Sequence, residues 1–246
     1  MSLPFNLGFS GLSSGLQTKN AAVVLTFGDD FSSYADQTAA DLAWPTSNTG
    51  QARVNISNDN INIIFTTANL DEVPTIYYDL TSTSNEKWVL RYKLNLTTIT
   101  APGNYNFACF MALSDNTSHA GISQDSIGLL LLISNGGTKQ YKCYDRDNAL
   151  LFEADPPTGD VTFSYTPVTG TIYVQITRSS TTAYTVKLYS DATYTTLIET
   201  ASGTTVSTVT NLRYIKFGMR DNSGHATGAL TATIDDIEFY NGVNSV

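Results

Sequence analysis

The sequence is poor in charge, above all in positive charge. Only 14% of its 246 residues are charged, and 13 lysines and arginines face 22 aspartates and glutamates, for a formal net charge of -9. Binding to a phosphate backbone needs clustered cations, and no basic stripe runs through this chain. The composition therefore argues against nucleic acid as a partner, and the same shortage argues against docking on anionic lipid.

Long apolar runs are missing as well. Residues 1–20, MSLPFNLGFSGLSSGLQTKN, lack the basic start and continuous apolar stretch of a secretory signal peptide. Nothing later is long enough to span a bilayer, so we expect no membrane insertion. We expect residues 1–20 to form an extended N-terminal arm, either disordered or docked on this or a neighbouring subunit as a route to a homo-oligomer. Residues 21–246 should form one domain.

Cysteine and histidine are the rarest useful side chains. The two cysteines, Cys109 and Cys143, leave a disulfide and two buried free thiols equally open. The two histidines lie in near-copies of one phrase, DNTSHA at 115–120 and DNSGHA at 221–226. The chain also lacks a serine-hydrolase elbow, a zinc-protease motif and a phosphate loop.

Alternation of apolar and polar residues is abundant. KWVLRYKLNL (87–96), TIYVQITRS (171–179) and AYTVKLYS (183–190) each place their apolar residues on one face, as half-buried antiparallel strands do. SIGLLLLIS (126–134) is apolar on both faces and predicts a central, covered strand. Turn clusters separate a dozen or more such runs, and only residues 33–44 indicate a short helix. The sequence predicts an all-β, two-sheet antiparallel sandwich.

Two phrases carry a family resemblance: GDDFSSY (28–34) and ATIDDIEFYNG (232–242). They resemble the opening and closing strands of concanavalin A-like jelly rolls, which include lectins, glucanases, laminin-G-like domains and several carbohydrate-binding modules. The resemblance implies that the first and last strands of the sandwich lie side by side. Within the second phrase the apolar face switches at Asp235 and Asp236, which predicts a β-bulge there.

The closing bulge suggests a metal site. If the first and last strands are neighbours, four carboxylates come together, and related modules often bind a structural ion at these strands. Oxygen ligands in irregular geometry suit calcium. The alternative is that these aspartates cap turns and face water. The candidate calcium ligands are Asp29, Asp30, Asp235 and Asp236.

Two further sets of residues are candidates for ligand binding. The two DN phrases each follow a strand and should form loops at the sheet rims, on one shared rim if the strand order allows. These loops could line a ligand site, bind a transition metal or serve only as turns. Exposed tyrosines with carboxylate neighbours could form a sugar platform, although core packing explains most aromatics. The candidates are Asp115, Asn116, His119, Asp221, Asn222 and His225 for the loops, and Tyr77, Tyr78, Tyr141, Tyr144 and Asp145 for the platform.

Catalysis has little support in the sequence. Glucanases of this fold alternate acidic residues along one central strand, and only IDDIEF (234–239) comes close to that pattern. We therefore expect no enzyme activity, with a glycoside hydrolase as the enzymatic alternative. The leading hypothesis is a non-catalytic surface protein of a virus or phage particle, located on the virion surface or extracellularly, whose partners are glycans or other virion proteins. The alternative is a carbohydrate-binding module of a secreted polysaccharide-degrading enzyme.

Overall fold

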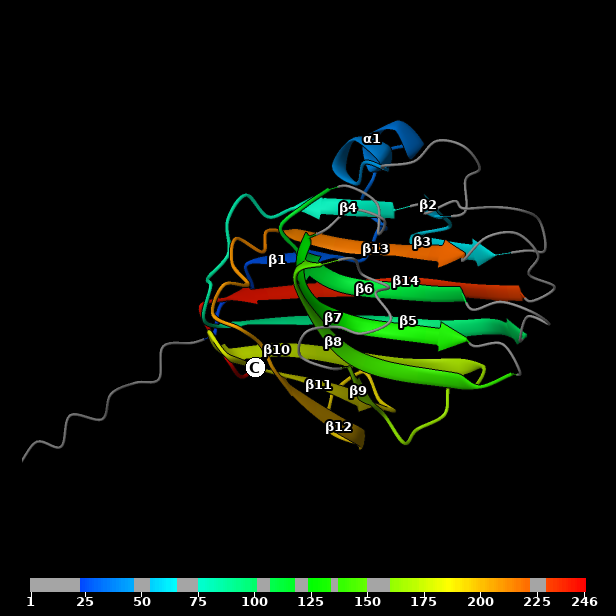
Figure 1. Cartoon of the computed structure of the whole chain (residues 1–246). Helices are drawn as coiled ribbons and strands as arrows, with labels where there is room; N and C mark the ends of the chain where they lie inside the picture. The colour runs from blue at the N-terminus through cyan, green and yellow to red at the C-terminus, as the bar shows by residue number, and fades with distance from the viewer. Residues whose placement is uncertain are drawn as a thin grey trace, which may run out of the picture.

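Two antiparallel β-sheets packed face to face make up the protein. A computed structural model describes residues 23–46, 54–65, 75–100, 107–117, 124–133, 137–149, 160–221 and 229–246. Figure 1 shows the two sheets one in front of the other, with their strands running across the view. The predicted two-sheet sandwich is thus confirmed, whereas the N-terminal arm at residues 1–20 lies outside the described residues.

The rear sheet, called sheet A, contains the first and the last described strands. Its members are β1 (Phe27–Asp29), β2 (Val54–Ser57), β3 (Asn60–Phe65), β5 (Trp88–Thr100), β10 (Gly170–Ser180), β11 (Ala183–Tyr189), β12 (Leu197–Thr204) and β14 (Ala229–Asn241). They run in the order β12-β11-β10-β5-β14-β3-β2, and β1 pairs with β14 on the same side as β3.

The front sheet, called sheet B, has six strands. They are β4 (Thr75–Asp79), β6 (Phe107–Ser114), β7 (Gln124–Ile133), β8 (Lys139–Ala149), β9 (Val161–Thr162) and β13 (Tyr214–Asp221). Their order is β4-β13-β6-β7-β8-β9. The near-continuous burial along β7 confirms that this strand is covered on both faces.

The core lies between the sheets and follows the alternation in the sequence. Trp88, Leu90 and Tyr92 on β5 are fully buried, as the period of two in KWVLRYKLNL predicts. The same holds for three alternate residues on β10 and three on β11: Ile172, Val174, Ile176, Tyr184, Val186 and Leu188.

A short helix, α1 (Gln37–Ala43), interrupts the strands where the sequence indicates one. The Asp36 side chain caps it by accepting a hydrogen bond from the backbone N–H of Ala39 at 2.9 Å. Its buried residue, Ala40, and the following Trp44 join the core. Among the described residues, no helix is long and apolar enough to cross a bilayer.

The first and last strands are neighbours, as the resemblance implies. β1 pairs antiparallel with β14, with Phe27 opposite Phe239 and Asp29 opposite Ile237. The predicted bulge is present, because the register of β14 against β5 shifts between Asp235 and Glu238. The extra residue, Asp236, has a φ of 51°, and its insertion lets the apolar residues on both sides of the bulge face the core.

The two DN phrases do not share a rim. They follow β6 and β13, which are direct antiparallel neighbours, with Ser114 opposite Tyr214 and Asp221 opposite Phe107. The phrases therefore start at opposite ends of an eight-residue run of pairing, whose end pairs are seven steps or about 24 Å apart at ~3.4 Å per residue. The condition for a shared rim, two strands that run in the same direction, is therefore not met.

The cysteines are too far apart to form a disulfide. Cys109 on β6 pairs with Leu131 of β7, and Cys143 on β8 pairs with Leu129 of β7, so a whole strand separates them. Two strand spacings are about 10 Å, whereas a disulfide needs Cα atoms within about 7 Å. Cys143 is a buried free thiol, and burial raises its pKa to about 12.

Candidate functional site

An open pocket of about 600 Å³ lies where the first and last strands meet. Its lining combines aromatic rings with carboxylates, and it draws on β1, β4, β10, β14, helix α1 and the loop that joins β11 to β12. The lining residues with aromatic or acidic side chains are Phe27, Asp29, Asp30, Tyr34, Tyr78, Tyr173, Tyr194, Asp236 and Glu238.

One wall of the pocket is an aromatic cluster around Tyr78. The Tyr78 ring stacks on Phe27, with centroids 4.0 Å apart and an interplanar angle of 24°, and tilts against Trp44 at 5.2 Å. Trp44 is fully buried, whereas Tyr78 and Phe27 are half-buried. The cluster thus anchors Tyr78 on the core side and leaves part of its ring to the pocket.

Asp29 organises the floor beside this wall. One carboxylate oxygen accepts the backbone N–H of Phe31 at 2.8 Å, and the other accepts the indole N–H of Trp44 at 2.8 Å and the hydroxyl of Tyr34. Burial, followed by this hydrogen bond to Asp29, raises the pKa of Tyr34. With three protein donors on two oxygens, Asp29 holds the pocket together.

Three other carboxylates keep more of their surface free. Asp30 is exposed and accepts only the backbone N–H and hydroxyl of Ser32; the Ser32 hydroxyl is the main cause of its lowered pKa. The side chains of Asp236 and Glu238 are 54% and 39% exposed. Glu238 accepts the hydroxyl of Tyr240 at 3.0 Å. These three groups can accept further hydrogen bonds from a ligand.

Three of the four predicted calcium ligands, Asp29, Asp30 and Asp236, line the pocket, whereas Asp235 is not among its lining residues. Asp235 pairs with Lys93, its Oδ2 lying 3.0 Å from Nζ, and Asp236 lies 3.7 Å from the same Nζ. The hydrogen bond from Lys93 to Asp235 is the main cause of the raised pKa of Lys93. No three histidine, cysteine or acidic side chains in the described ranges come together to hold a metal ion. Calcium binding stays a prediction, without support from this geometry.

Another part of the lining comes from the loop between β11 and β12. Tyr194 lines the pocket with Ala192 of the same loop and Tyr173 of β10. The Tyr194 ring meets Tyr173 edge-on at a centroid distance of 5.9 Å, and the Arg91 guanidinium lies 4.3 Å from its centroid. This part of the lining was missed from the sequence, where a lone tyrosine in SDATYTT gives no sign of its position.

A second polar feature lies on the outer face of sheet B, away from the core. Lys216 of β13 is fully buried there, and its Nζ donates to Gln124 Oε1 at 2.5 Å and to the Asn116 carbonyl at 2.9 Å. Ser114 donates to the same Gln124 oxygen at 2.7 Å. Burial lowers the pKa of Lys216 to about 7, and Asp115 opposes that shift. In RYIKFG, Lys216 has the alternation of a solvent-facing residue, so its burial was not predicted.

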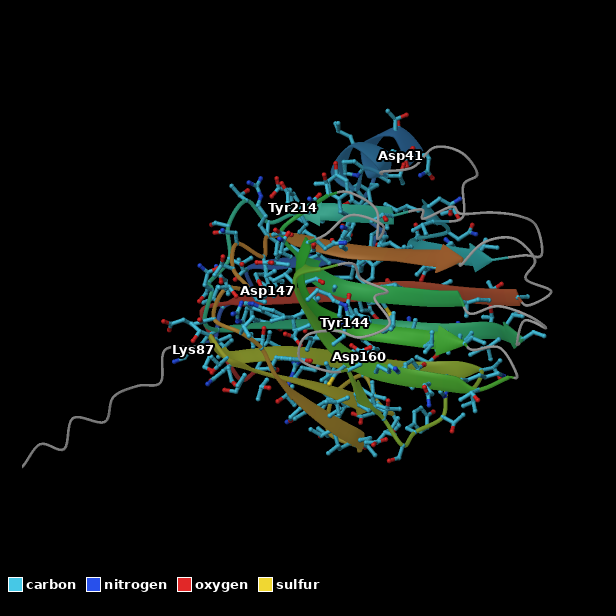
Figure 2. All side chains as sticks on the ribbon, in the orientation of Figure 1. Asp41, Lys87, Tyr144, Asp147, Asp160 and Tyr214 are labelled. Carbon is cyan, nitrogen blue, oxygen red and sulfur yellow. The ribbon has the colours of Figure 1, made fainter. Side chains whose placement is uncertain are left out.

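Two of the predicted tyrosines are too buried to be sugar platforms. Tyr141 is 1% exposed and faces the core, where it stacks on Tyr165. Tyr144 lies on the outer face of sheet B (Figure 2) and is 0% exposed. The Arg146 guanidinium lies 5.0 Å from its ring centroid. Asp145 points inward at 1% exposure, with Tyr184 as its partner. The platform prediction was wrong here because β8 is covered on both faces.

The remaining predicted residues are placed apart from the pocket. Tyr77 lies on β4 opposite Lys216, half-buried, with its ring edge-on to Tyr214. Asp115 accepts the backbone N–H of Asp125 at 3.0 Å, and burial raises its pKa. Asp221 ends β13, but its side chain is not described. Three predicted residues lie outside the described residues altogether: His119, Asn222 and His225.

Comparisons with known proteins support the fold. No protein-family model matches the sequence, and no curated protein matches it. Solved structures do match. The alginate lyase Aly36B is 10% identical with a TM-score of 0.55, covering 89% of this chain and 98% of its own. A legume lectin-like domain from Entamoeba histolytica is 9% identical with a TM-score of 0.55, covering 90% and 99%.

A lectin solved in complex with galactose is similar to the same degree. Lectin UEA-II, complexed with galactose, is 13% identical with a TM-score of 0.54, covering 87% of this chain and 97% of its own. At such low identity the matches report architecture alone. The protein has the concanavalin A-like jelly-roll fold, which both lectins and a polysaccharide lyase use.

Proposed function

We propose that the protein is a non-catalytic, lectin-like module that binds an uncharged glycan in the pocket beside β1 and β14. The observation that carries the proposal is the pairing of aromatic rings with exposed carboxylates in one open pocket. Sugar rings offer apolar C–H faces to aromatic side chains and hydroxyl groups to acceptors. Tyr78 and Tyr194 supply the first kind of contact, and Asp236 and Glu238 supply the second.

The charge of the pocket selects against acidic sugars. Four carboxylates line it, and none of its described lining residues is a lysine or an arginine. Two cations lie beside the pocket, and both already have partners: Lys93 pairs with Asp235, and Arg91 lies 3.9 Å from Glu238 and donates to Gln175. A uronate or sulfated chain would meet repulsion without a compensating partner, whereas a neutral chain would meet none.

A binding assay with matched variants tests the proposal. On an array of neutral and acidic oligosaccharides, we expect signals from neutral sugars. Calorimetry with the neutral sugar that binds best should then show at least ~10-fold weaker binding to the double variant Asp236→Asn, Glu238→Gln. The reason is that each charge-assisted hydrogen bond contributes about 1.5–3 kcal/mol. Asp41→Asn is the control, since Asp41 is an exposed carboxylate on α1 outside the pocket lining (Figure 2). An array without any signal would contradict the proposal, and so would an equal loss of affinity in the double variant and in the Asp41→Asn control.

A second candidate function is polysaccharide cleavage on the outer face of sheet B. A β-elimination needs a base near neutrality and an acid for the leaving oxygen. Lys216, with its pKa lowered by burial to about 7, has Tyr77 as its cross-strand neighbour. This candidate ranks second because Lys216 is 0% exposed and already bonded to Gln124. Incubation with alginate, followed by absorbance of the unsaturated product, tests it; an unchanged absorbance removes this candidate and leaves the binding proposal intact.

The biological setting stays a prediction from the sequence. We favour the surface of a virus or phage particle, with a carbohydrate-binding module of a secreted enzyme as the alternative. The glycan-binding pocket serves either setting. Proteomics of purified particles separates them, because only a particle protein co-purifies in fixed ratio with capsid components.

A further inference from the structure

The loop of residues 190–196 carries Tyr194 and Ala192 into the pocket. It joins β11 to β12 and is closed at its base by a backbone hydrogen bond of 3.0 Å from Ser190 to the Thr196 carbonyl. Its sequence, SDATYTT, is rich in hydroxyl side chains. The loop therefore depends on local hydrogen bonds for its shape.

A single carboxylate, that of Asp191, organises the loop. Its Oδ1 accepts the backbone N–H of Thr196 at 2.5 Å. Its Oδ2 accepts the backbone N–H groups of Thr193 and Thr195, at 3.1 and 3.2 Å, together with both of their hydroxyl groups. These bonds, led by the one from the Thr193 side chain, hold the pKa of Asp191 well below its usual range. The carboxylate thus fixes the backbone on both sides of Tyr194.

Tyr194 is held in a conformation that a free loop would rarely adopt. Its φ is 55°, in the left-handed region that disfavours a bulky side chain. Its ring lies edge-on to both Tyr173 and Tyr189, at 5.9 and 5.4 Å, beneath the Arg91 guanidinium. Burial raises the pKa of Tyr194, which keeps its hydroxyl protonated. Backbone strain of this kind persists where the surroundings over-determine the position.

Arg91 is itself fixed, so the ring has a rigid support. Its Nε donates to Gln175 Oε1 at 2.8 Å, and its Nη2 donates to the main-chain oxygen of Val246 at 2.9 Å. Glu238 of the pocket lies 3.9 Å from its Nη1. The support of Tyr194 and the acidic side of the pocket are thus one connected structure.

We propose that Tyr194 is the specificity-determining wall of the pocket and that Asp191 is the residue that positions it. The inference rests on the proposed glycan binding and adds which part of the pocket discriminates among neutral sugars. Tyr78 is built into the core-side cluster and offers every ligand the same surface. Tyr194 lines the same pocket from a separate loop, so the placement of its ring changes the space available to a sugar. Because the Tyr194 ring is already held in place, a sugar that contacts it does not have to immobilise a mobile side chain, which would weaken binding.

The test of Tyr194 compares affinities across a panel of neutral hexasaccharides: cellohexaose, xylohexaose, mannohexaose and laminarihexaose. Tyr194→Ala should weaken the best ligand at least ~10-fold and reorder the panel, whereas Tyr214→Ala should change neither. Tyr214 is a matched control: it is also half-buried, has an arginine near its ring (Arg213, 4.9 Å from the centroid) and an edge-on tyrosine beside it (Tyr77, 5.7 Å), but lies on sheet B.

The test of Asp191 uses a spectroscopic signal that does not depend on ligand. Trp44 and Trp88 are 0% exposed, so in a Tyr194→Trp protein acrylamide quenches mainly the new indole. Adding Asp191→Ala should raise the acrylamide quenching constant severalfold and reduce the differences in affinity among the panel sugars. Asp191→Asn keeps one acceptor oxygen, so it should change the quenching constant and the affinity differences less than Asp191→Ala does.

The outcomes separate this inference from the proposed function. If the wild-type protein binds no neutral sugar on the array or in the panel, both are overturned. Binding that Tyr194→Ala leaves unchanged in strength and order overturns the role of Tyr194 alone. Unchanged quenching after Asp191→Ala overturns the positioning role of Asp191, because the loop would then hold its shape without that carboxylate.

Discussion

Replacing the buried lysine of sheet B with methionine, Lys216→Met, should change how stability depends on pH. Burial lowers the pKa of Lys216 from 10.5 to about 7 in the folded protein. Between these values the unfolded chain binds a proton that the folded chain has released, so the free energy of unfolding rises with pH. At about 1.4 kcal/mol per pH unit, this contribution grows to at most about 5 kcal/mol by pH 10.5. Methionine fills a similar volume and cannot titrate, so the variant should lack this rise.

Urea unfolding followed by tryptophan fluorescence at pH 6 to 10 measures the effect. The wild-type free energy of unfolding minus that of Lys216→Met should climb above pH 7. Cys143, whose pKa burial raises to about 12, titrates in both proteins and cancels in the difference. Lys187→Met, at a partly exposed lysine on the outer face of sheet A, controls for the loss of a lysine. Parallel curves for wild type and Lys216→Met would refute the reasoning, because they would mean that the amine keeps its proton in the fold.

Three further predictions concern the pocket. Asp29→Ala should lower the free energy of unfolding by about 2 kcal/mol in urea titrations, because it leaves the buried Trp44 indole N–H without its acceptor; an unchanged midpoint would show that another acceptor replaces it. Asp236→Gly should lower the free energy of unfolding by under about 0.5 kcal/mol and Asp236→Val by about 1–2 kcal/mol, measured in the same titrations, because a φ of 51° suits glycine and strains a branched side chain. Equal losses in the two variants would contradict this account. If calcium binds as the sequence predicts, EDTA should lower the melting temperature by several degrees, and an unchanged melting temperature would remove the calcium prediction.

The strands and their buried faces were predictable because alternation is a local signal. Burial of Trp88, Leu90 and Tyr92 follows from the spacing of residues in one strand, and the bulge follows from the phase change at Asp235 and Asp236. The pairing of strands was not predictable in the same way. That β6 and β13 are antiparallel neighbours depends on the path of the whole chain, and this pairing is what separates the two DN phrases.

The candidate site was predicted only in part. Asp29, Asp30 and Asp236 were brought together by the expected pairing of the first and last strands, and Tyr78 was singled out for its ring. Tyr194 was missed because its position depends on the bonds of Asp191 and on packing against a distant strand. The buried Lys216 was missed because alternation distinguishes the two faces of a strand but does not tell whether the outer one is covered.

The place of β14 in sheet A has a consequence for biosynthesis. Both β1, at residues 27–29, and β5, at residues 88–100, pair with this final strand, at residues 229–241. While the chain is being made, both must wait for a partner that leaves the ribosome more than a hundred residues later, and such distant pairings form slowly. The pocket has walls from both strands of the β1–β14 pair, so a nascent or truncated chain would lack it. Sugar capture would thus mark chains that include β14, and an affinity step on the right glycan would separate them from fragments that lack this strand.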